Sequence, residues 1–242
     1  MLLPIIGSQI NGATRWIDFG PVSVQPSEFM KPFFAVTMAW LFALKIRHPH
    51  RPMILLAGGI TVFLAFLLMI QPDLGQTIIV AAMFGVLLII SGLALRWIFG
   101  LAGFAIAALT TAYFTYNVAT MRINQWLFGG VENDQIDLAH KALTAGGLTG
   151  VGTGLGTRKF SLPEAHTDYV FSVIGEEYGL LVCGLIAAAF FVIVMRVLMR
   201  LQEERDPFII YATAALITQF GGQALINMMV NLRLFPSKGM TL

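Results

Sequence analysis

The stretch YGLLVCGLIAAAFFVIVM, residues 178–195, decides the fold, because it carries no charged side chain over nearly the length that crosses a bilayer. It belongs to a longer apolar run, Tyr169–Met195, whose only charged residues are Glu176 and Glu177. The segment LPEAHTD, residues 162–168, leads directly into this run. Ionisable groups at a membrane edge are costly to keep, so by default they indicate a functional site. We therefore expect a spanning helix here, with the chemistry at its start.

The composition indicates an integral membrane protein. Of the 242 residues, 57% are hydrophobic and only 12% are charged, whereas a soluble domain has about 25% charged residues. The net charge of +2 is too small to suggest nucleic-acid binding. Cys183 is the one cysteine, which excludes an internal disulfide and a thiolate metal site. Its apolar surroundings predict a small buried side chain.

Six stretches are apolar and long enough, or nearly so, to form spanning helices, which need about 20 residues. They are Glu28–Ile46, Met53–Ile70, Thr77–Leu95, Trp97–Tyr116, Tyr169–Met195 and Phe208–Met228. The pattern predicts an all-α fold, a polytopic membrane helical bundle that forms one integral membrane domain over residues 1–242. Residues 117–168 are predicted to form a long loop between the fourth and fifth complete spans.

The distribution of basic residues predicts the orientation in the membrane. Short loops on one side hold most of the basic residues outside the long loop: Lys45, Arg47, Arg51, Arg96, Arg196, Arg200 and Arg205. Arg15 and Lys31 lie on the other side. Short cytoplasmic loops are enriched in Lys and Arg, whereas long loops cross the membrane largely regardless of charge. The long loop and its acidic end are therefore predicted to be extracytoplasmic.

The acidic segment has a structural and a chemical interpretation. Ser161 and Glu164 have the spacing of a capping box that begins a helix, and Asp168 would then lie too far into that helix to be a cap. Structurally, Asp168 pairs with a nearby cation or is favoured by the helix dipole. In the chemical interpretation, partial shielding would raise the pKa of Asp168, so that it could serve as a general base at neutral pH. Glu176 and Glu177 are predicted to bind a cation, hold a neighbouring loop or bond another helix.

A glycine-rich segment, GGLTGVGTGLGTRK, occupies residues 146–159. It lacks both the Gly-Lys-Ser/Thr ending and the GxGxxG spacing of nucleotide-binding loops, and no strand precedes it. Composition favours a mobile surface hairpin. The alternative is a loop whose backbone amides, together with Arg158 and Lys159, receive a pyrophosphate.

Polar residues near the N-terminus are predicted to lie on the same side as the acidic segment. Trp16 is either an interfacial belt residue or part of the site, and Arg15 beside it suits an anionic head group. Glu28 and Lys31, three residues apart on a helix, are predicted to form an ion pair. Asp73 is expected to cap the next span or to line the same cavity.

Four segments occur in order along the chain: Arg15-Trp16-Ile17 with Gln25-Pro26-Ser27-Glu28, then Gln71-Pro72-Asp73-Leu74-Gly75, then residues 162–168 with Gly175-Glu176-Glu177, and finally Lys238-Gly239-Met240-Thr241-Leu242. In these segments the chain resembles the SEDS family (shape, elongation, division and sporulation), and its division branch more than its elongation branch. The motifs cover nearly the whole chain, so the resemblance is specific.

This resemblance implies a ten-span peptidoglycan glycosyltransferase of the bacterial inner membrane. Such a protein polymerises lipid II, an undecaprenyl-pyrophosphate-linked disaccharide peptide, beside a class B penicillin-binding transpeptidase and other division proteins. Asp168 matches the family's essential catalytic residue, and Trp16 matches a required tryptophan. The other substrate-binding candidates that the family suggests are three basic positions and two residues of the catalytic motif: Arg15, Lys31, Lys238, Glu164 and His166. Compared with the family, the first spans and the last span are absent, so a fragment at both ends is expected.

The expected mechanism starts with Asp168 removing the proton from the 4-hydroxyl of the acceptor N-acetylglucosamine. The oxygen then attacks the anomeric carbon of the donor N-acetylmuramic acid with inversion, and undecaprenyl pyrophosphate leaves. Arg15, Lys159, Lys238 or a divalent cation such as Mg²⁺ or Mn²⁺ would stabilise the leaving group. His140 and His166 cannot form a conventional zinc site without several carboxylates, and no other cofactor is predicted.

Three alternatives stay open at this point. An elongation polymerase would carry out the same reaction. A transporter that flips lipid II would use Asp168 and Glu176 as a proton relay, although it should carry ionisable residues near the middle of several spans. A scaffold that only recruits the transpeptidase gives no reason for the cluster of acids and bases.

Overall fold

A computed structural model describes the chain at residues 8–10, 13–18, 23–71, 73–92, 135–162, 165 and 167–235, and at scattered positions between 100 and 124. The chain divides into two compact units. Unit 1 comprises Met1–Ala105 and Val197–Gln219, and unit 2 comprises Ile106–Arg196 and Phe220–Leu242. The single membrane domain over residues 1–242 stays a prediction.

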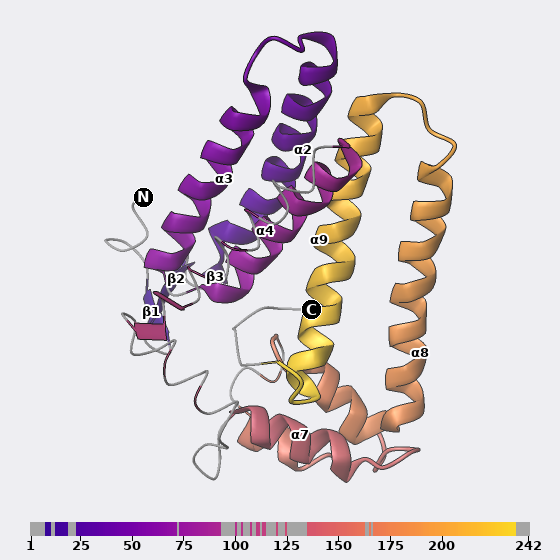
Figure 1. The fold of residues 1–242 in the computed structure, drawn as a ribbon. Helices are drawn as coiled ribbons and strands as arrows, with labels where there is room; N and C mark the ends of the chain where they lie inside the picture. The colour runs from indigo at the N-terminus through magenta and orange to yellow at the C-terminus, as the bar shows by residue number, and fades with distance from the viewer. Residues whose placement is uncertain are drawn as a thin grey trace. The chain divides into compact units, whose positions relative to one another are not determined.

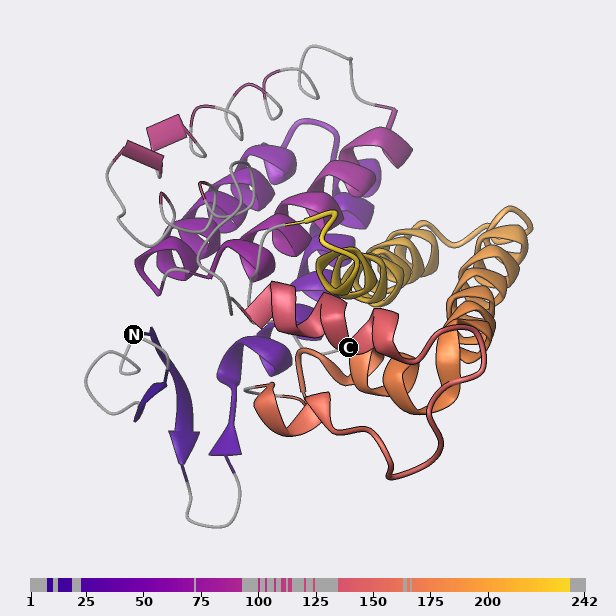
Figure 2. The same ribbon diagram turned by 90° about the horizontal axis from the view of Figure 1, so that it is seen from below.

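Three short strands precede the first helix of unit 1. They are β1 (Ser8–Ile10), β2 (Ala13–Asp18) and β3 (Ser23–Val24), and they pair antiparallel in the order β1-β2-β3 (Figure 2). These strands were not predicted from the sequence. A local signal existed, because the dipeptide Asn-Gly at residues 11–12 is a strong hairpin former between two strand-like segments.

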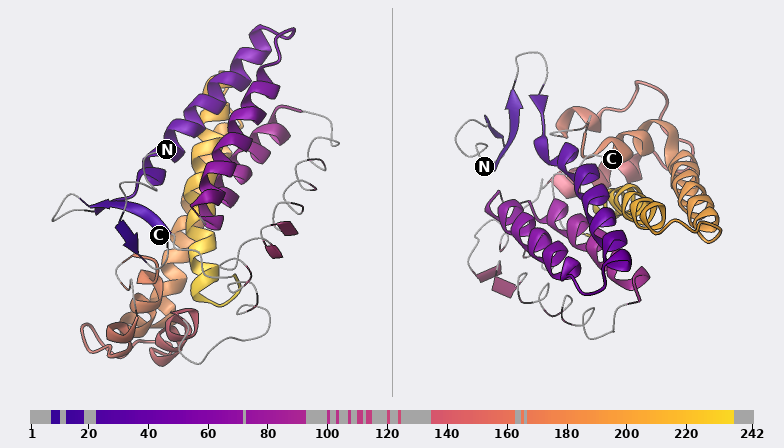
Figure 3. Two further views of the ribbon diagram at one scale, coloured as in Figure 1. Left: turned by 90° about the vertical axis from the view of Figure 1, so that its left-hand side faces the viewer. Right: turned by 90° about the horizontal axis from the view of Figure 1, so that it is seen from above.

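Helices α2 (Pro26–Arg47), α3 (Met53–Ile70) and α4 (Leu74–Ile90) pack side by side in unit 1 (Figure 3). The buried side of α2 includes Phe34, Met38 and Phe42, whose spacing of four residues places them on one face of a helix. The Phe42 ring meets the Phe84 ring of α4 edge-on, with 5.9 Å between the centroids. Aromatic and aliphatic contacts of this kind form the core of the unit.

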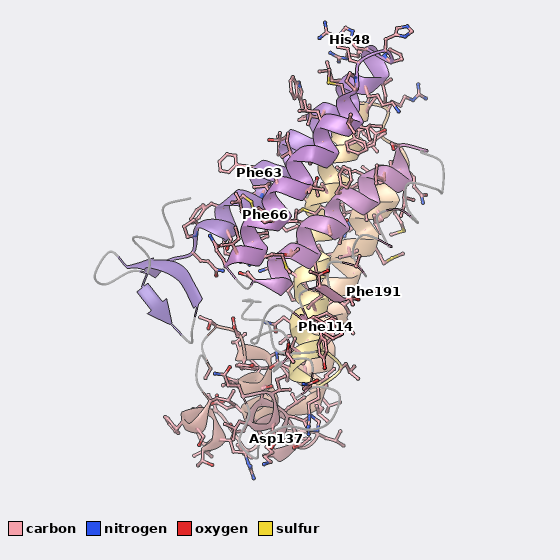
Figure 4. All side chains as sticks on the ribbon, turned by 60° about the vertical axis from the view of Figure 1, so that its left-hand side comes forward. His48, Phe63, Phe66, Phe114, Asp137 and Phe191 are labelled. Atoms are coloured by element: carbon pink, nitrogen blue, oxygen red, sulfur yellow. The ribbon has the colours of Figure 1, made fainter. Side chains whose placement is uncertain are left out.

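The opposite faces of these helices carry large apolar side chains that no described residue covers. Phe63 and Phe66 of α3 point away from the neighbouring helices (Figure 4) and are 50% and 61% exposed. In water such a surface would be unfavourable, at about 25 cal/mol for each Å². A hydrocarbon environment removes this cost, so these faces fit a membrane protein.

Unit 2 is built around the N-terminal part of α8 (Val170–Leu201), the C-terminal part of α9 (Pro207–Asn231) and helix α7 (Gln135–Ala145) (Figure 1). A short 3-10 helix, η1 (Arg158–Ser161), packs against α7. Two clusters of buried side chains join these elements. One contains Ala139, Ala142, Leu162, Ala165, Tyr169 and Val230, and the other contains Leu143, Phe171, Cys183, Ala224 and Met228.

The prediction of a polytopic helical membrane bundle is confirmed. Four described helices are long and apolar enough to cross a membrane: α2, α3, α8 and α9. Helix α3 has the predicted bounds, and α4 begins three residues before the predicted Thr77 because Asp73 caps it. Most of the predicted span Trp97–Tyr116 lies outside the described residues. Cys183 is buried and unpaired, as predicted.

The long loop predicted over residues 117–168 contains regular structure, because α7 and η1 lie within it. The predicted start of a helix at Ser161 is wrong. Ser161 is the last residue of η1, and α8 begins only at Val170. Asp168 therefore precedes the helix and lies in a turn, instead of occupying the helix's first turns.

Candidate functional site

The turn at residues 167–169 carries Asp168, the predicted catalytic residue, immediately before α8. The residue is half-buried. Its backbone carbonyl oxygen accepts a hydrogen bond from the side-chain amide of Asn227, at 3.0 Å, and lies 3.4 Å from the amide nitrogen of Asn231. Both asparagines come from α9. The main chain at Asp168 is therefore attached to a second helix by side chains.

Glu176 holds the loop that precedes the acidic segment. The residue is 2% exposed, and its carboxylate accepts hydrogen bonds from the backbone amides of Arg158 and Lys159 at 2.9 and 3.1 Å. These are the first amides of η1, which an anionic acceptor stabilises. The predicted role of holding a neighbouring loop is confirmed for Glu176.

The ammonium group of Lys159 forms an ion pair with Glu177. The pair is partly exposed, so water screens part of the attraction. Lys159 was predicted to bind the leaving pyrophosphate. In this structure its positive charge is compensated by a carboxylate on the neighbouring helix.

Helix α8 is broken at Gly179, whose backbone angles of φ 83° and ψ 173° are not helical. The glycine-rich segment fills the break. Its residues Val151 and Gly152 donate backbone hydrogen bonds to the carbonyls of Glu176 and Glu177, at 2.9 and 3.0 Å. In return, Leu180 donates to the carbonyl of Gly147 at 3.0 Å. The loop thus replaces hydrogen bonds that the helix loses at its break.

Close approach of the two backbones explains the glycines of this segment. A Cβ atom added to Gly146 would lie 1.9 Å from the carbonyl oxygen of Gly175, and one added to Gly150 would lie 2.2 Å from that of Glu177. Real carbon atoms do not approach oxygen so closely. Two amides that the pyrophosphate hypothesis needs, those of Val151 and Gly152, are already bonded to α8. The segment is packed against α8, unlike the predicted mobile hairpin.

The break at Gly179 also divides α8 into a short part before it and a long part after it. Leu180–Leu201 is about 33 Å long at 1.5 Å per residue, which suffices to cross the hydrocarbon core of about 30 Å. Asp168, Glu176 and Glu177 lie before this part. Their position fits the predicted site at the membrane edge.

A buried polar cluster lies where α2 and α4 begin in unit 1. Lys31 is completely buried, and its ammonium nitrogen lies 2.7 Å from a carboxylate oxygen of Glu28, which confirms the predicted pair. The other oxygen of Glu28 accepts a hydrogen bond from Gln76 at 2.6 Å. Asp73 caps α4 through the backbone amide of Gln76, at 3.3 Å, as predicted. Through Glu28, this cluster connects Lys31 in the first turns of α2 to Gln76 at the start of α4.

Asp137, in the first turn of α7 and labelled in Figure 4, forms two ion pairs. Its carboxylate lies 2.6 Å from the ammonium of Lys141 and 3.0 Å from the guanidinium of Arg233, which follows α9. The hydrogen bond from Lys141, assisted by the charges of both cations, lowers the pKa of Asp137 below its usual value. The pairs connect α7 to the chain beyond α9.

The remaining predicted site residues are only partly described. Arg15 and Trp16 lie on β2, and the pairing of the strands is known, whereas their side chains lie outside the described residues. Glu164, His166 and Lys238 also lie outside them. Arg15, Trp16 and Lys31 belong to unit 1, whereas Asp168 and Lys159 belong to unit 2. The roles of all these residues stay predictions.

The described residues do not fit a metal centre. Among them, no three His, Cys, Asp or Glu side chains come close enough together to hold an ion. Both carboxylate oxygens of Glu176 accept backbone amides, and Glu177 is paired with Lys159. The described residues therefore include no cluster that would hold Mg²⁺ or Mn²⁺.

A groove of about 840 Å³ lies on unit 1, with mainly apolar walls from α3 and α4 and with Lys45 and Arg51 in its lining. It contains none of the predicted site residues. Nothing in its lining connects it to the chemistry expected of Asp168.

Asn227 and Asn231, which are 1% and 0% exposed, were not predicted as site residues. A signal existed. The two residues are four positions apart and continue the spacing of Gln219 and Gln223, so these amides share one face of an otherwise largely apolar helix. Polar side chains within a spanning helix are rare and are retained where they have a partner.

Comparison with known proteins shows which family the chain belongs to. The family model described as "cell cycle protein", which covers FtsW, RodA and SpoVE, matches residues 1–242. The chain is similar to the probable peptidoglycan glycosyltransferase FtsW of Caulobacter vibrioides, with 40% identity over 99% of this chain and 62% of the relative. The chain spans 62–65% of the length of such curated relatives, which is less than two thirds.

Solved structures show the same similarity. One is a chain of a peptidoglycan synthase complex, studied for the coordination of polymerization and crosslinking, with a TM-score of 0.76 and 25% identity. The match covers 100% of this chain and 69% of that one. Another is the rod shape determining protein RodA of Thermus thermophilus, with a TM-score of 0.65, 27% identity, and coverage of 100% and 64%.

Proposed function

Because the chain belongs to the FtsW, RodA and SpoVE family of cell cycle proteins, we propose that it is the membrane part of a peptidoglycan glycosyltransferase. Its substrate would be lipid II, which it polymerises into glycan strands during septal wall synthesis. The similarity to proteins named as probable FtsW glycosyltransferases supports the division role over the elongation role. The protein crosses the membrane several times, and its site is proposed to face the periplasm of the inner membrane.

The observation that carries this proposal is the placement of Asp168. The residue lies in a turn before the membrane-crossing part of α8, is half-buried, and has its main chain attached to α9. A general base must be reachable by its substrate and also held in place. The tether to α9 meets the second requirement, and the residue is only partly buried, which supports the first.

In the proposed reaction Asp168 accepts the proton of the acceptor's 4-hydroxyl group. The resulting alkoxide oxygen attacks the anomeric carbon of the donor N-acetylmuramic acid, and the bond to the pyrophosphate oxygen breaks with inversion. Both substrates are anchored in one leaflet by their lipid tails, so the site gains much of its rate from orientation. The departing pyrophosphate carries the negative charge away.

Basic residues would stabilise that leaving group. Arg15 and Lys238 are candidates from the family pattern, and Lys159 is a candidate from its place beside the acidic segment. Lys159 would have to exchange the carboxylate of Glu177 for the pyrophosphate. The two side chains are 21% and 12% exposed, so this exchange would have to offset the loss of a mostly buried ion pair. Lys31, buried on Glu28, is a less accessible candidate.

We also propose a partner for the polymerase. The solved complex with the higher TM-score is described as one that coordinates polymerization and crosslinking. By similarity, this protein would work with a class B penicillin-binding transpeptidase and other division proteins. The lipid-facing aromatic side chains of α3 and α8, such as Phe66 and Phe191 (Figure 4), offer apolar surface for helix contacts.

The distribution of charge disfavours a lipid II transporter. Within the described spans, the ionisable residues of α2 and α8 lie near the helix ends or before the break at Gly179, and α3 and α9 contain no Asp, Glu, Lys or Arg. A proton-coupled flippase is expected to have them near the middle of spans. Vesicles with labelled lipid II would detect transport directly.

The test of the proposal uses the full-length protein purified with its transpeptidase partner. Asp168→Ala should reduce the rate of lipid II polymerisation by about 10²–10⁴-fold, the usual contribution of general base catalysis. Glu203→Ala, which removes an exposed carboxylate after α8, should leave the rate unchanged. A wild-type rate for Asp168→Ala would reject the proposed base.

A further inference from the structure

We propose that Asn227 and Asn231 of α9 are positioning residues for Asp168, holding its main chain so that its carboxylate faces the acceptor hydroxyl. This inference rests on the proposed function, because it assumes that Asp168 is the base. It assigns a role in the reaction to a helix that contributes none of the predicted site residues.

The hydrogen bonds form a closed network. Asn227 donates to the carbonyl oxygen of Asp168 at 3.0 Å, and Asn231 approaches the same oxygen at 3.4 Å. The side-chain oxygen of Asn231 accepts from the backbone amide of Ser172 at 3.2 Å and from its hydroxyl at 2.5 Å. Asn231 also donates to the carbonyl of Asn227 at 2.9 Å. Two asparagines therefore connect α9 to the turn at Asp168 and to Ser172 in the first turn of α8.

The network fixes the orientation of each amide. If the amide of Asn231 were turned over, its oxygen would face the carbonyl oxygens of Asp168 and Asn227, and its nitrogen would face the amide of Ser172. Both changes bring like groups together, and the surrounding hydrogen bonds decide such assignments. Only the observed orientation lets Asn231 accept from the backbone amide of Ser172 and donate to the carbonyl of Asn227.

Burial makes the network costly to break. Asn227, Asn231 and Ser172 are 1%, 0% and 0% exposed, so water cannot replace a lost partner. Apolar contacts surround the same turn, because Tyr169 and Val230 belong to one buried cluster. Within this turn Asp168 is half-buried, whereas its neighbour Tyr169 is only 3% exposed. The turn is therefore packed at Tyr169, whereas Asp168 is only partly buried.

Rigid attachment matters for a base on a turn. A catalytic group must be held within about 0.5 Å of its productive position, and a displacement of about 1 Å can cost 10²-fold in rate. No regular helix fixes Asp168, since α8 begins at Val170. Fixing the carbonyl of Asp168 fixes the peptide plane that follows it, and so limits the directions in which the side chain can leave the backbone.

The decisive variant is Asn227→Leu, made in the full-length protein with its transpeptidase partner. Leucine has a similar size and removes the amide that donates to Asp168. We expect kcat for lipid II polymerisation to fall by about 10–100-fold with KM unchanged. The matched control is Thr218→Val on the same helix, which removes a hydroxyl that donates to Ala214 at 2.7 Å and does not contact Asp168. The control should keep its kcat.

A second background separates positioning from structure. In Asp168→Asn protein, adding Asn227→Leu should lower the rate no further, because the group that it positions is already lost. A loss that multiplies through both changes would overturn the positioning role. So would a fall in thermal stability of Asn227→Leu with wild-type kcat, which is the result expected of a merely structural residue.

Two outcomes distinguish this inference from the proposed function. Asp168→Asn at the wild-type rate would overturn the proposed base, and the positioning role with it. A normal kcat for Asn227→Leu beside an inactive Asp168→Asn would overturn the positioning role alone. If Asn227→Leu does not fold, Ser172→Ala removes only one hydroxyl from the network. It should lower kcat with KM unchanged, and an unchanged kcat would refute the inference.

Discussion

Substitution of Gly179 by alanine should destabilise the protein strongly, because two independent costs add at this position. The backbone angles, φ 83° and ψ 173°, lie in a region that is essentially limited to glycine, and another residue there costs about 1–3 kcal/mol. The added Cβ would also lie 2.3 Å from the carbonyl oxygen of Leu148 and 2.5 Å from the amide nitrogen of Gly150. Overpacking of this kind costs a further ~1–3 kcal/mol.

The two costs sum to about 2–6 kcal/mol of unfolding free energy. The backbone cannot simply move apart, since Leu180 and Leu181 donate hydrogen bonds to Gly147 and Leu148 at the same contact, at 3.0 and 3.3 Å. For a chain of this size, 1 kcal/mol shifts the thermal midpoint by about 2–4 °C. We therefore expect the midpoint of Gly179→Ala to fall by at least about 4 °C.

The assay is thermal unfolding of the full-length protein in detergent, with Gly184→Ala as the matched control. Gly184 lies on the same helix, and a Cβ there would meet nothing within 4 Å. Alanine is a better helix former than glycine by about 1 kcal/mol, so the control should be unchanged or slightly more stable. Equal midpoints for the two variants would refute the account of the broken helix and its glycine-rich partner.

Two further predictions concern charged groups away from Asp168. Lys31→Met leaves the carboxylate of Glu28 without its cation and should cost about 3 kcal/mol, the lower end for a broken buried pair because Glu28 is 30% exposed. Adding Glu28→Gln should recover part of that loss in the same thermal assay, and a double variant as unstable as Lys31→Met would contradict the pairing. Asp137 has a lowered pKa in the folded state, so its ion pairs stabilise the protein above about pH 4 and the contribution is lost as the pH falls through the lowered value. The difference in midpoint between wild type and Asp137→Asn should therefore shrink from about pH 6 to about pH 3, and a constant difference would exclude this titration.

The spans could be predicted because a single local property determines them. Met53–Ile70 has the predicted bounds, since an uninterrupted apolar run between polar turns is sufficient to specify a membrane helix. Pairs of nearby residues were also predictable. The Glu28–Lys31 ion pair and the cap at Asp73 depend only on helical spacing and residue type.

Local sequence patterns could not predict contacts between segments that are far apart in the chain. The start of α8 was misplaced because the spacing of Ser161 and Glu164 imitates a local cap. In the structure Ser161 ends the 3-10 helix η1, and the carboxylate of Glu176, later in the chain, accepts the first amides of η1. The break at Gly179 depends on hydrogen bonds from a loop about thirty residues earlier. Nothing within α8 itself distinguishes that glycine from an ordinary one.

The sequence predicted where the candidate site lies, but it did not predict the contacts that hold Asp168 in place. Ionisable residues beside an apolar run pointed to the turn at Asp168, and the structure places this residue before the crossing part of α8. The attachment of the turn to Asn227 was missed, because asparagine carries no charge and stands out only by helical spacing. The roles of Arg15, Trp16 and Lys238 stay predictions.

The central claim is that the carboxylate of Asp168 acts as the base in lipid II polymerisation. Asp168→Asn tests it most directly, because asparagine keeps the size and shape of the side chain and removes only its basicity. The measurement is the initial rate of polymerisation by the full-length protein with its partner, beside Asp137→Asn, which removes a carboxylate of α7 from the same unit. The account predicts a loss of about 10²–10⁴-fold for Asp168→Asn and none for Asp137→Asn. Equal rates for the two variants would contradict it.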